Sequence, residues 1–357
     1  SSSLSRRSWL AAGAAVVGAQ EVSGPVRLPR KVRLVLIGLD GHTGEILRPL
    51  PRLPDVELVA VCDPDGERLA RAFRHFQPPP RQYTDPERLL TTEKLDMAAV
   101  CGPNGGRAAH ILACLNHKLH VVAEKPIALT RGELEEIRTN VQRHNRRLSM
   151  LLPMRFSSPY LALKKIVASG QIGEVIQIAS QKSYKAGDRP EWMQNAATYG
   201  GTIPWIGIHM FDLMRFTSGR EFREVFSLKA HLGYPQLGAM ENVTGSLFAM
   251  DNGGIATLRM DYLRPETAAT PGDDRLRLAG LEGIAEYQAA TGVTLMTAKS
   301  EPQVVRDLPA ERPLFIDFLE SVYAGKPTAL PHEDIFRVSE ITLAAEEAAV
   351  EHRIVKI

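Results

Sequence analysis

Residues 32–44 read VRLVLIGLDGHTG, a mostly apolar run that leads into a turn with three glycines. The run is typical of a buried strand, and residues 45–50 after the turn predict a helix. Glycines let the backbone approach a pyrophosphate, while N–H groups and the positive helix end face the anion. An ordinary strand-to-helix turn fits the GxxGxxG spacing equally well. The predicted phosphate cradle consists of Gly38, Leu39, Asp40, Gly41, His42 and Gly44.

The next predicted strand, residues 56–62, ends at Asp63, which lies 19 positions after Gly44. A carboxylate at this distance accepts hydrogen bonds from the adenosine ribose of a dinucleotide and repels a 2′-phosphate. We therefore expect NAD, with NADP as the alternative because Arg68 follows on the next helix. Residues 63–66 can also be interpreted as a turn that only caps this helix.

Lys125 follows another short apolar run, residues 120–123. Strands here and at 96–101 alternate with helices such as 106–118, which predicts a parallel, doubly wound α/β sheet. The sequence Glu124-Lys125-Pro126 then places the lysine at the carboxyl edge, where such sheets bind ligands. A lysine beside a carboxylate suits proton transfer to a carbonyl or alkoxide if burial lowers its pKa. The alternative is a solvated Lys–Glu pair at a strand end.

The second half of the chain changes from alternating strands and helices to mostly strands. Its Gly/Asn/Asp turns and its stretches of period two predict a mainly antiparallel sheet. An open face on such a sheet favours a homo-dimer or homo-tetramer. One long helix is predicted at 200–217 and a final one at 331–352. The predicted strands are 174–182, 223–231, 243–250, 254–262, 275–280 and 284–289.

The helical residues 204–217 carry a second group of candidates. His209 and Asp212 are three positions apart and share one helix face, with Trp205 one turn earlier. An imidazole held by a carboxylate suits acid–base catalysis or the orientation of a substrate. A histidine satisfied within the core is the alternative.

Charge and composition narrow the class of partner. The chain has 43 basic and 41 acidic residues without a basic run, which gives no support for nucleic-acid binding. No His, Cys or carboxylate cluster has metal-ligand spacing, so no metal is expected.

Residues 1–19 place Arg6-Arg7 before a short run of small apolar residues. This pattern is typical of a twin-arginine export signal and is too short to span a membrane. We therefore expect a periplasmic or secreted protein without a membrane segment once the signal is removed. If the arginines are incidental, a cytoplasmic location is expected instead.

The ordered set of motifs resembles the Gfo/Idh/MocA oxidoreductase family, which includes glucose–fructose oxidoreductase and inositol dehydrogenase. The resemblance covers residues 31–357. Besides the glycine turn and Asp63, it rests on Pro103-Asn104, Glu124-Lys125-Pro126, Arg155-Phe156, Ile172-Gly173-Glu174, Gly200-Gly201…His209…Asp212 and Leu281-Glu282-Gly283.

The resemblance implies a Rossmann domain at 31–150 and a substrate and oligomerisation domain with an open, mostly antiparallel sheet at 151–330. Residues 331–357 would form a C-terminal helix that packs back on the Rossmann domain. The implied catalytic residues are Lys125 and His209. The implied cofactor contacts extend to Pro103, Asn104, Glu124, Lys125 and Pro126, and the implied substrate contacts are Arg155, Trp205, His209 and Asp212.

Three positions near the expected site depart from the family pattern. Asp40 occupies the place of a glycine, and Arg107 stands where a histidine usually follows the Pro-Asn pair. Trp205 replaces an aspartate four positions before the histidine. An indole exchanges no proton and is not expected to orient Lys125, although it can stack on a sugar face.

The predicted function is an exported NAD(P)-dependent oxidoreductase that acts by hydride transfer on a sugar, sugar derivative or cyclitol. Because free NAD is scarce outside the cell, an exported enzyme needs a tightly bound cofactor that is regenerated within each turnover. One alternative is an NAD-dependent glycosidase that oxidises its substrate transiently. Another is a non-catalytic sugar-binding or structural relative that has lost the chemistry.

Overall fold

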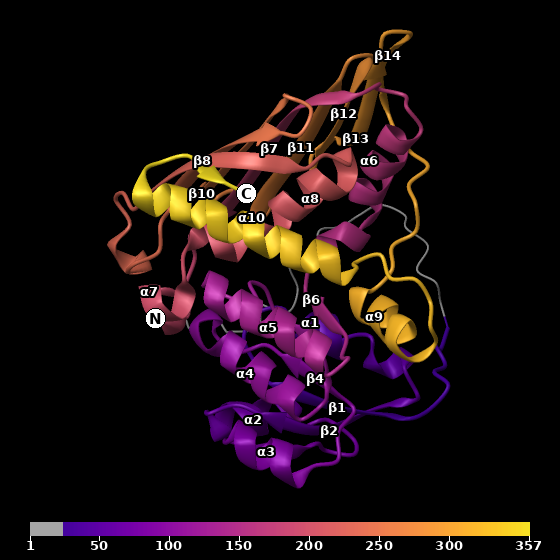
Figure 1. Ribbon diagram of the computed structural model, residues 1–357, viewed down its shortest axis with the longest axis vertical. Helices are drawn as coiled ribbons and strands as arrows, with labels where there is room; N and C mark the ends of the chain where they lie inside the picture. Colours follow the sequence, from indigo (N-terminus) through magenta and orange to yellow (C-terminus); the bar gives the residue numbers. More distant parts are fainter. Residues whose placement is uncertain (1–23) are drawn as a thin grey trace.

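The structure is a computed structural model that describes residues 24–357, so the export signal predicted at 1–19 lies outside the described residues. Two sheets organise it (Figure 1): a six-stranded sheet in the first half and a nine-stranded sheet in the second. Across residues 24–357, no helix has the length and apolar character needed to cross a bilayer.

The six-stranded sheet is parallel throughout, in the order β3-β2-β1-β4-β5-β6. The central strands are continuous apolar runs because both faces of the sheet are covered. The strand order reverses between β1 and β4, which puts a ligand-binding crevice at their carboxyl ends. The doubly wound sheet predicted from the sequence is therefore confirmed. Its strands are β1 (Val32–Ile37), β2 (Val56–Cys62), β3 (Arg81–Tyr83), β4 (Met97–Val100), β5 (His120–Ala123) and β6 (Leu148–Met150).

Three helices of this half, α2, α3 and α5, begin at a side chain that caps their first turn. Asp65 accepts a hydrogen bond from the N–H of Arg68 at the start of α2, and Thr130 forms a capping box with Glu133 at the start of α5. The helices are α1 (Gly44–Leu47), α2 (Gly66–Phe73), α3 (Pro86–Thr92), α4 (Asn104–Asn116) and α5 (Arg131–Arg143), with a 3₁₀ turn at Leu50–Arg52.

The first glycine of the turn is required by the close approach of two strand ends. Gly38 has a φ of 82°, and a Cβ there would overlap the backbone of Gly102, which follows β4. The glycine turn and the end of β4 therefore pack backbone to backbone at the crevice.

The nine-stranded sheet has the order β14-β13-β12-β11-β7-β10-β9-β8-β15. Its described neighbours are antiparallel, except that β7 and β10 are parallel. The sequence missed β13, β14 and β15, because short strands near a sheet edge carry a weak apolar pattern. The strands are β7 (Val175–Lys185), β8 (Phe222–Ala230), β9 (Val243–Met250), β10 (Ile255–Arg264), β11 (Gly272–Gly280), β12 (Gly283–Gln288), β13 (Gly292–Thr297), β14 (Ser300–Val304) and β15 (Val355–Lys356).

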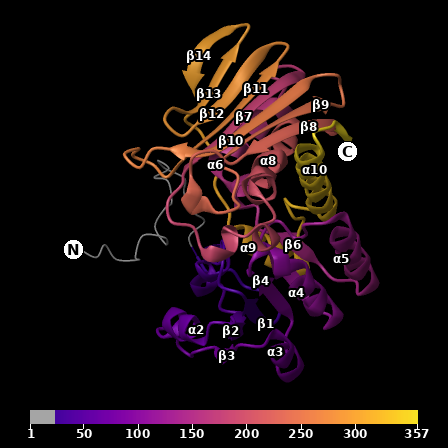
Figure 2. The ribbon, with the colours of Figure 1, turned by 90° about the vertical axis from the view of Figure 1, so that its left-hand side faces the viewer.

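Figure 2 shows α6, α8 and α10 on the side of this sheet that faces the six-stranded one. The single helix predicted at 200–217 begins as a π-helical turn, Ile203–Gly207, before it continues as α8. Such turns are frequent at functional sites. The helices are α6 (Ser158–Ala168), α7 (Ala196–Tyr199), α8 (Ile208–Ser218), α9 (Leu314–Tyr323) and α10 (His332–Glu351), with 3₁₀ turns at Pro153–Phe156, Glu191–Met193 and Pro235–Leu237.

The C-terminal helix α10 lies between the two halves (Figure 1). It packs against β8 and α8 of the second half as well as α5 and β6 of the first. On the α5 side, Glu347 pairs with Arg131 at 2.9 Å and Glu340 pairs with Arg138. The helix thus contacts the Rossmann domain, and it also packs on the second half, which the sequence did not predict.

Candidate functional site

Lys125 is buried at the carboxyl end of β5, as predicted, with 1% of its surface exposed. Its Nζ donates to the backbone oxygen of Trp205 at 2.6 Å and lies 3.1 Å from the centre of the indole ring. Burial lowers the pKa of Lys125 to about 7; Glu124 opposes this shift, while Arg107 and Lys182 add to it. The expectation that Trp205 does not orient Lys125 is therefore wrong, because its carbonyl group and its ring face both hold the amine.

Glu124 is folded into the glycine turn. Its carboxylate accepts hydrogen bonds from the backbone N–H and, at 2.7 Å, from the imidazole Nδ1 of His42. A Cβ on Gly41 would overlap this carboxylate, so the glycine is needed for the approach. Burial would raise the pKa of Glu124, but His42, Lys125 and Arg107 together lower it to about 2. Glu124 is thus an anion that ties the turn to the strand end carrying the lysine.

His209 reaches the same cluster from α8. Its ring centre lies 5.7 Å from that of His42, and its Nδ1 has no hydrogen-bond partner within residues 24–357. Burial, with the charges of Lys125 and Lys182, holds the pKa of His209 well below its usual value, so the imidazole is neutral. A neutral ring with an unpartnered nitrogen is available to a substrate hydroxyl group.

Asp212 does not hold His209, contrary to the prediction. It pairs with Arg155, whose Nε donates to its Oδ2 at 3.0 Å, while Nη1 of Arg155 donates to Asp334 at 2.6 Å. The Arg155 and Asp212 side chains are each only 1% exposed. The pair braces Pro153–Phe156 and α8 against the start of α10, and this arrangement does not support the predicted substrate contacts.

The predicted cofactor residues surround the glycine turn. Asp63 accepts a hydrogen bond from the backbone N–H of Leu39 at 3.0 Å, which fixes the tip of β2 against the turn. The extra carboxylate of Asp40 is compensated, because Arg68 donates to it at 3.1 Å and Trp192 Nε1 donates to it at 3.2 Å. Asp40 therefore anchors a loop of the second half over the turn.

The Pro103-Asn104 pair opens α4 at the same edge. Asn104 donates to the backbone oxygen of Tyr199 at 2.6 Å, and its own buried Oδ1 has no partner in the described chain. A dinucleotide in the crevice would supply donors to such an acceptor, so the residues present fit NAD. Behind them, Arg107 donates to the carbonyl groups of Gly102 and Pro126 at 2.6 and 2.7 Å, tying the end of β4 to the end of β5.

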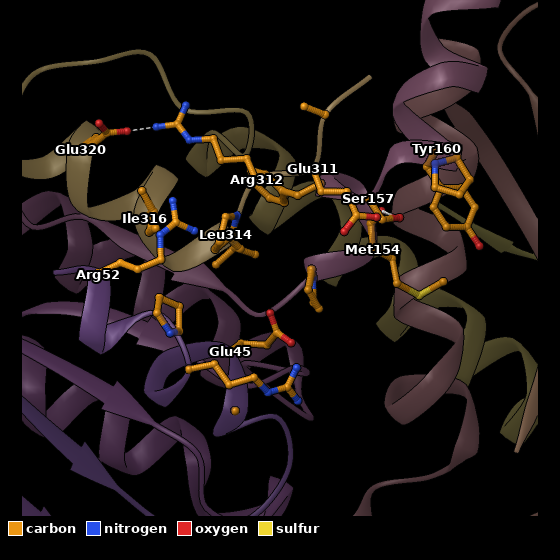
Figure 3. A pocket seen from close by; sticks show the side chains of 18 of the residues that line it. Glu45, Arg52, Met154, Ser157, Tyr160, Glu311, Arg312, Leu314, Ile316 and Glu320 are labelled. Atoms are coloured by element: carbon orange, nitrogen blue, oxygen red, sulfur yellow. Dashed lines mark hydrogen bonds and ion pairs between the residues drawn. The ribbon is translucent and has the colours of Figure 1, made fainter. Parts of the chain in front are cut away.

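A cavity of about 880 Å³ begins at the end of the glycine turn, where Gly44 lines it (Figure 3). Glu45 lines it from α1, and Met154 and Tyr160 line it from the second half. Asp274 of β11 also lines it and accepts a hydrogen bond from Nζ of Lys182 at 2.9 Å.

Sequence reasoning missed Lys182, although a signal was present. Ile178 and Ser180 face the core, so the alternation of β7 assigns position 182 to the buried face as well. A lysine on that face is expected to have a partner, and here the partner is Asp274.

Comparison with known proteins agrees with this arrangement. Residues 32–152 match the model of an oxidoreductase family with an NAD-binding Rossmann fold, and residues 160–286 match the GFO/IDH/MocA C-terminal domain. The chain belongs to the GFO/IDH/MocA oxidoreductase family. The resemblance inferred from the motifs is thereby confirmed, as are the two-domain fold and the NAD-binding oxidoreductase class.

Two relatives have names that give a cyclitol or a glucoside as substrate. A myo-inositol 2-dehydrogenase of Thermotoga maritima is 25% identical over 338 residues, 91% of this chain and 98% of that protein. A D-glucoside 3-dehydrogenase of Escherichia coli is 29% identical over 230 residues, 58% of this chain and 63% of that protein. A solved structure from Thermotoga maritima, 31% identical, superposes with a TM-score of 0.85 over 91% of this chain and 100% of its own.

Proposed function

We propose that this GFO/IDH/MocA protein oxidises a ring hydroxyl group of a sugar or cyclitol, with Lys125 as the proton acceptor. The observation that carries the proposal is a buried amine with a pKa of about 7 at the carboxyl end of β5. A general base whose pKa lies near the working pH is effective in proton transfer. The inositol and glucoside relatives support the substrate class.

The chain's own groups account for the proton. Neutral Lys125 takes it from the substrate hydroxyl, and the resulting ammonium is stabilised by the carbonyl and ring face of Trp205. The unpartnered Nδ1 of His209 orients the same hydroxyl group. The glycine turn, Asp63 and Asn104 would hold NAD, which would accept the hydride.

The Lys125→Met variant tests this assignment. We expect turnover on sugars and cyclitols to fall by about 10²- to 10⁴-fold, the usual contribution of a general base, while NAD binding is retained. Formation of NADH measures the first quantity and titration calorimetry the second. Lys165→Met, on the exposed side of α6, is the matched control. Unchanged turnover in Lys125→Met would refute the role, and a wild type that binds NAD without oxidising any polyol would favour the non-catalytic alternative.

We also propose that the enzyme is exported with its cofactor bound and recycles it within each turnover. Arg6-Arg7 before a short small-residue run supports this proposal. Native mass spectrometry of protein purified without added cofactor is expected to show one NAD per chain. Cell fractionation is expected to recover the wild type from the periplasm and an Arg6→Lys, Arg7→Lys variant from the cytoplasm. A cofactor-free, cytoplasmic wild type would contradict both parts.

The remaining part of the proposal is that the protein forms a homo-oligomer, in which chains associate through the open face of the nine-stranded sheet. Leu228, Leu247 and Ile255 on β8, β9 and β10 are 51%, 47% and 50% exposed. Large apolar side chains gathered on one sheet face favour association. Leu247→Glu is expected to lower the mass found by sedimentation to that of a monomer, whereas a wild-type monomer would contradict the proposal.

A further inference from the structure

Arg68 stands beside the carboxylate assigned to the adenosine ribose. It lies in the first turn of α2, shortly after the end of β2, and 37% of its side chain is exposed. Its Nη1 lies 3.5 Å from Oδ2 of Asp63. In dinucleotide-binding folds an arginine near this carboxylate accommodates the 2′-phosphate that distinguishes NADP from NAD. Asp63 and Arg68 by themselves therefore leave the choice between the two cofactors open.

Asp40 engages the same guanidinium from the glycine turn. Nη2 of Arg68 donates to Oδ1 of Asp40 at 3.1 Å and to the backbone oxygen of Leu39 at 2.6 Å. The guanidinium thus lies between two carboxylates, and both of its terminal nitrogens have partners. A phosphate group would have to compete with these carboxylates for the same donors.

This group of three side chains has an excess of negative charge. The carboxylates of Asp40 and Asp63 face one guanidinium, so one negative charge remains, whereas Asp63 and Arg68 alone would be neutral. A phosphate monoester carries about −1.5 to −2 charges at neutral pH. Like charges a few ångströms apart repel each other most where burial reduces screening by water. The ribose hydroxyl groups of NAD are uncharged and meet no such repulsion.

The carboxylate of Asp40 is fixed in this position. Its side chain is 12% exposed, and the Oδ1 that binds Arg68 also accepts a hydrogen bond from Nε1 of Trp192 at 3.2 Å. The backbone N–H of Asp40 donates to the carbonyl group of Cys101 at 2.9 Å. Because an indole is a neutral donor, Trp192 holds the carboxylate without cancelling its charge.

We propose that Asp40 is a cofactor-specificity residue, which makes the crevice bind NAD and reject NADP. It engages Arg68, and it leaves a net negative charge beside Asp63. The residue that stands in place of a family glycine thereby decides the choice that Asp63 and Arg68 leave open. The inference concerns the cofactor alone, so it holds whatever substrate Lys125 acts on.

Displacement of bound NADH by NAD and by NADP tests the proposal without turnover. NADH fluorescence gives the dissociation constant of each cofactor, and we expect the wild type to bind NAD at least about 100-fold more tightly than NADP. Asp40→Asn keeps the size of the side chain and removes its charge. The preference for NAD should then fall about 10- to 100-fold, the range expected for one part-buried charge pair. Asp40→Gly, which also releases Arg68, should lower the preference at least as far.

Two further variants identify the cause. Trp192→Phe is the matched control, because it removes the other partner of Asp40 and keeps the charge. It should weaken the binding of both cofactors alike and leave the preference unchanged. Asp40→Asn combined with Arg68→Met should lose the gained affinity for NADP, since the released guanidinium would bind the phosphate. Retained NADH binding shows that each variant is folded.

The outcomes separate this proposal from the proposed function. A wild type that binds NADP as tightly as NAD overturns the specificity role, and so does a preference that Asp40→Asn and Asp40→Gly both leave unchanged. A gain in NADP affinity that persists without Arg68 overturns it as well. An Asp40-dependent preference for NAD in a protein that oxidises no sugar or cyclitol supports the specificity role and refutes only the polyol chemistry.

Discussion

At Lys125, burial opposes the contacts that favour the charged amine. The Trp205 carbonyl and ring face stabilise an ammonium, whereas burial and the cations Arg107 and Lys182 favour the neutral form. The balance leaves a pKa of about 7, which lets the amine accept a proton and later release it.

This pKa gives a pH dependence with a definite sign. Oxidation needs the neutral amine, so kcat/KM should rise with pH and level off above about pH 7, and the reverse reduction should decline over the same range. Initial rates in both directions, measured at constant ionic strength, check this. A profile for oxidation that is flat across neutrality would exclude Lys125 as the base.

The positive charge of Arg107 contributes to the low pKa of Lys125. Replacing it by Met removes a buried positive charge, so the apparent pKa of the oxidation profile should move upward, while Arg107→Lys should keep most of the charge effect. The pH–rate profiles of the two variants measure the difference. Arg107→Met also leaves two buried carbonyl groups unpaired, which destabilises the protein. Thermal melts at one pH therefore check that each variant is folded. Identical profiles for both folded variants would contradict the electrostatic role.

At the scale of elements, the 3₁₀ turn Glu191–Met193 contacts the glycine turn through Trp192. Trp192 donates to Asp40, which Arg68 also binds, so a loop of the second half is fastened over the cofactor cradle. The residue that departs from the family glycine pattern thus has a partner far away in the sequence.

Trp192→Phe removes this hydrogen bond and keeps an aromatic ring. We expect NAD to dissociate about two- to tenfold faster, in line with the loss of one hydrogen bond to a charged or neutral acceptor. Stopped-flow displacement of bound NADH measures the rate. Tyr234→Phe, on the neighbouring loop, serves as the control, and an unchanged dissociation rate in Trp192→Phe would show that the contact does not retain the cofactor.

At the scale of the whole molecule, α10 contacts both halves, and its first turn is anchored on the second half. Asp334 in its first turn binds Arg155 at 2.6 Å and Arg215 at 3.4 Å, so one carboxylate links the segment after β6, α8 and the last helix. Burial raises the pKa of Asp334, but the two arginines lower it overall.

Asp334→Asn should therefore destabilise the protein in a pH-dependent way. A group with a lowered pKa stabilises the fold above its unfolded-state value of about 3.9 and loses that contribution as the pH falls further. We expect the free energy of unfolding to fall by about 1–3 kcal/mol at neutral pH. This difference between wild type and variant should become smaller as the pH is lowered. Urea unfolding at several pH values measures it, with the exposed Glu333→Gln as control. A difference that is independent of pH would contradict the ionic origin.

The sequence by itself determined the parallel sheet, the cofactor class and the edge where Lys125 lies. These features are encoded locally: apolar runs, glycine turns and the residue that follows each strand depend on neighbours in the chain. The order of such motifs was enough to indicate the family. The helix repeat likewise placed His209 and Trp205 on the helical segment that meets Lys125.

Only the tertiary structure decided which of these side chains are partners. Trp205 meets Lys125 across 80 positions, Asp212 meets Arg155 across 57, and Asp274 meets Lys182 across 92. Helix spacing suggested that Asp212 holds His209, but a buried arginine from another segment forms the stronger, charge-assisted pair. Contacts of this kind depend on how whole elements pack, and a local pattern carries no information about the element that arrives from elsewhere in the chain.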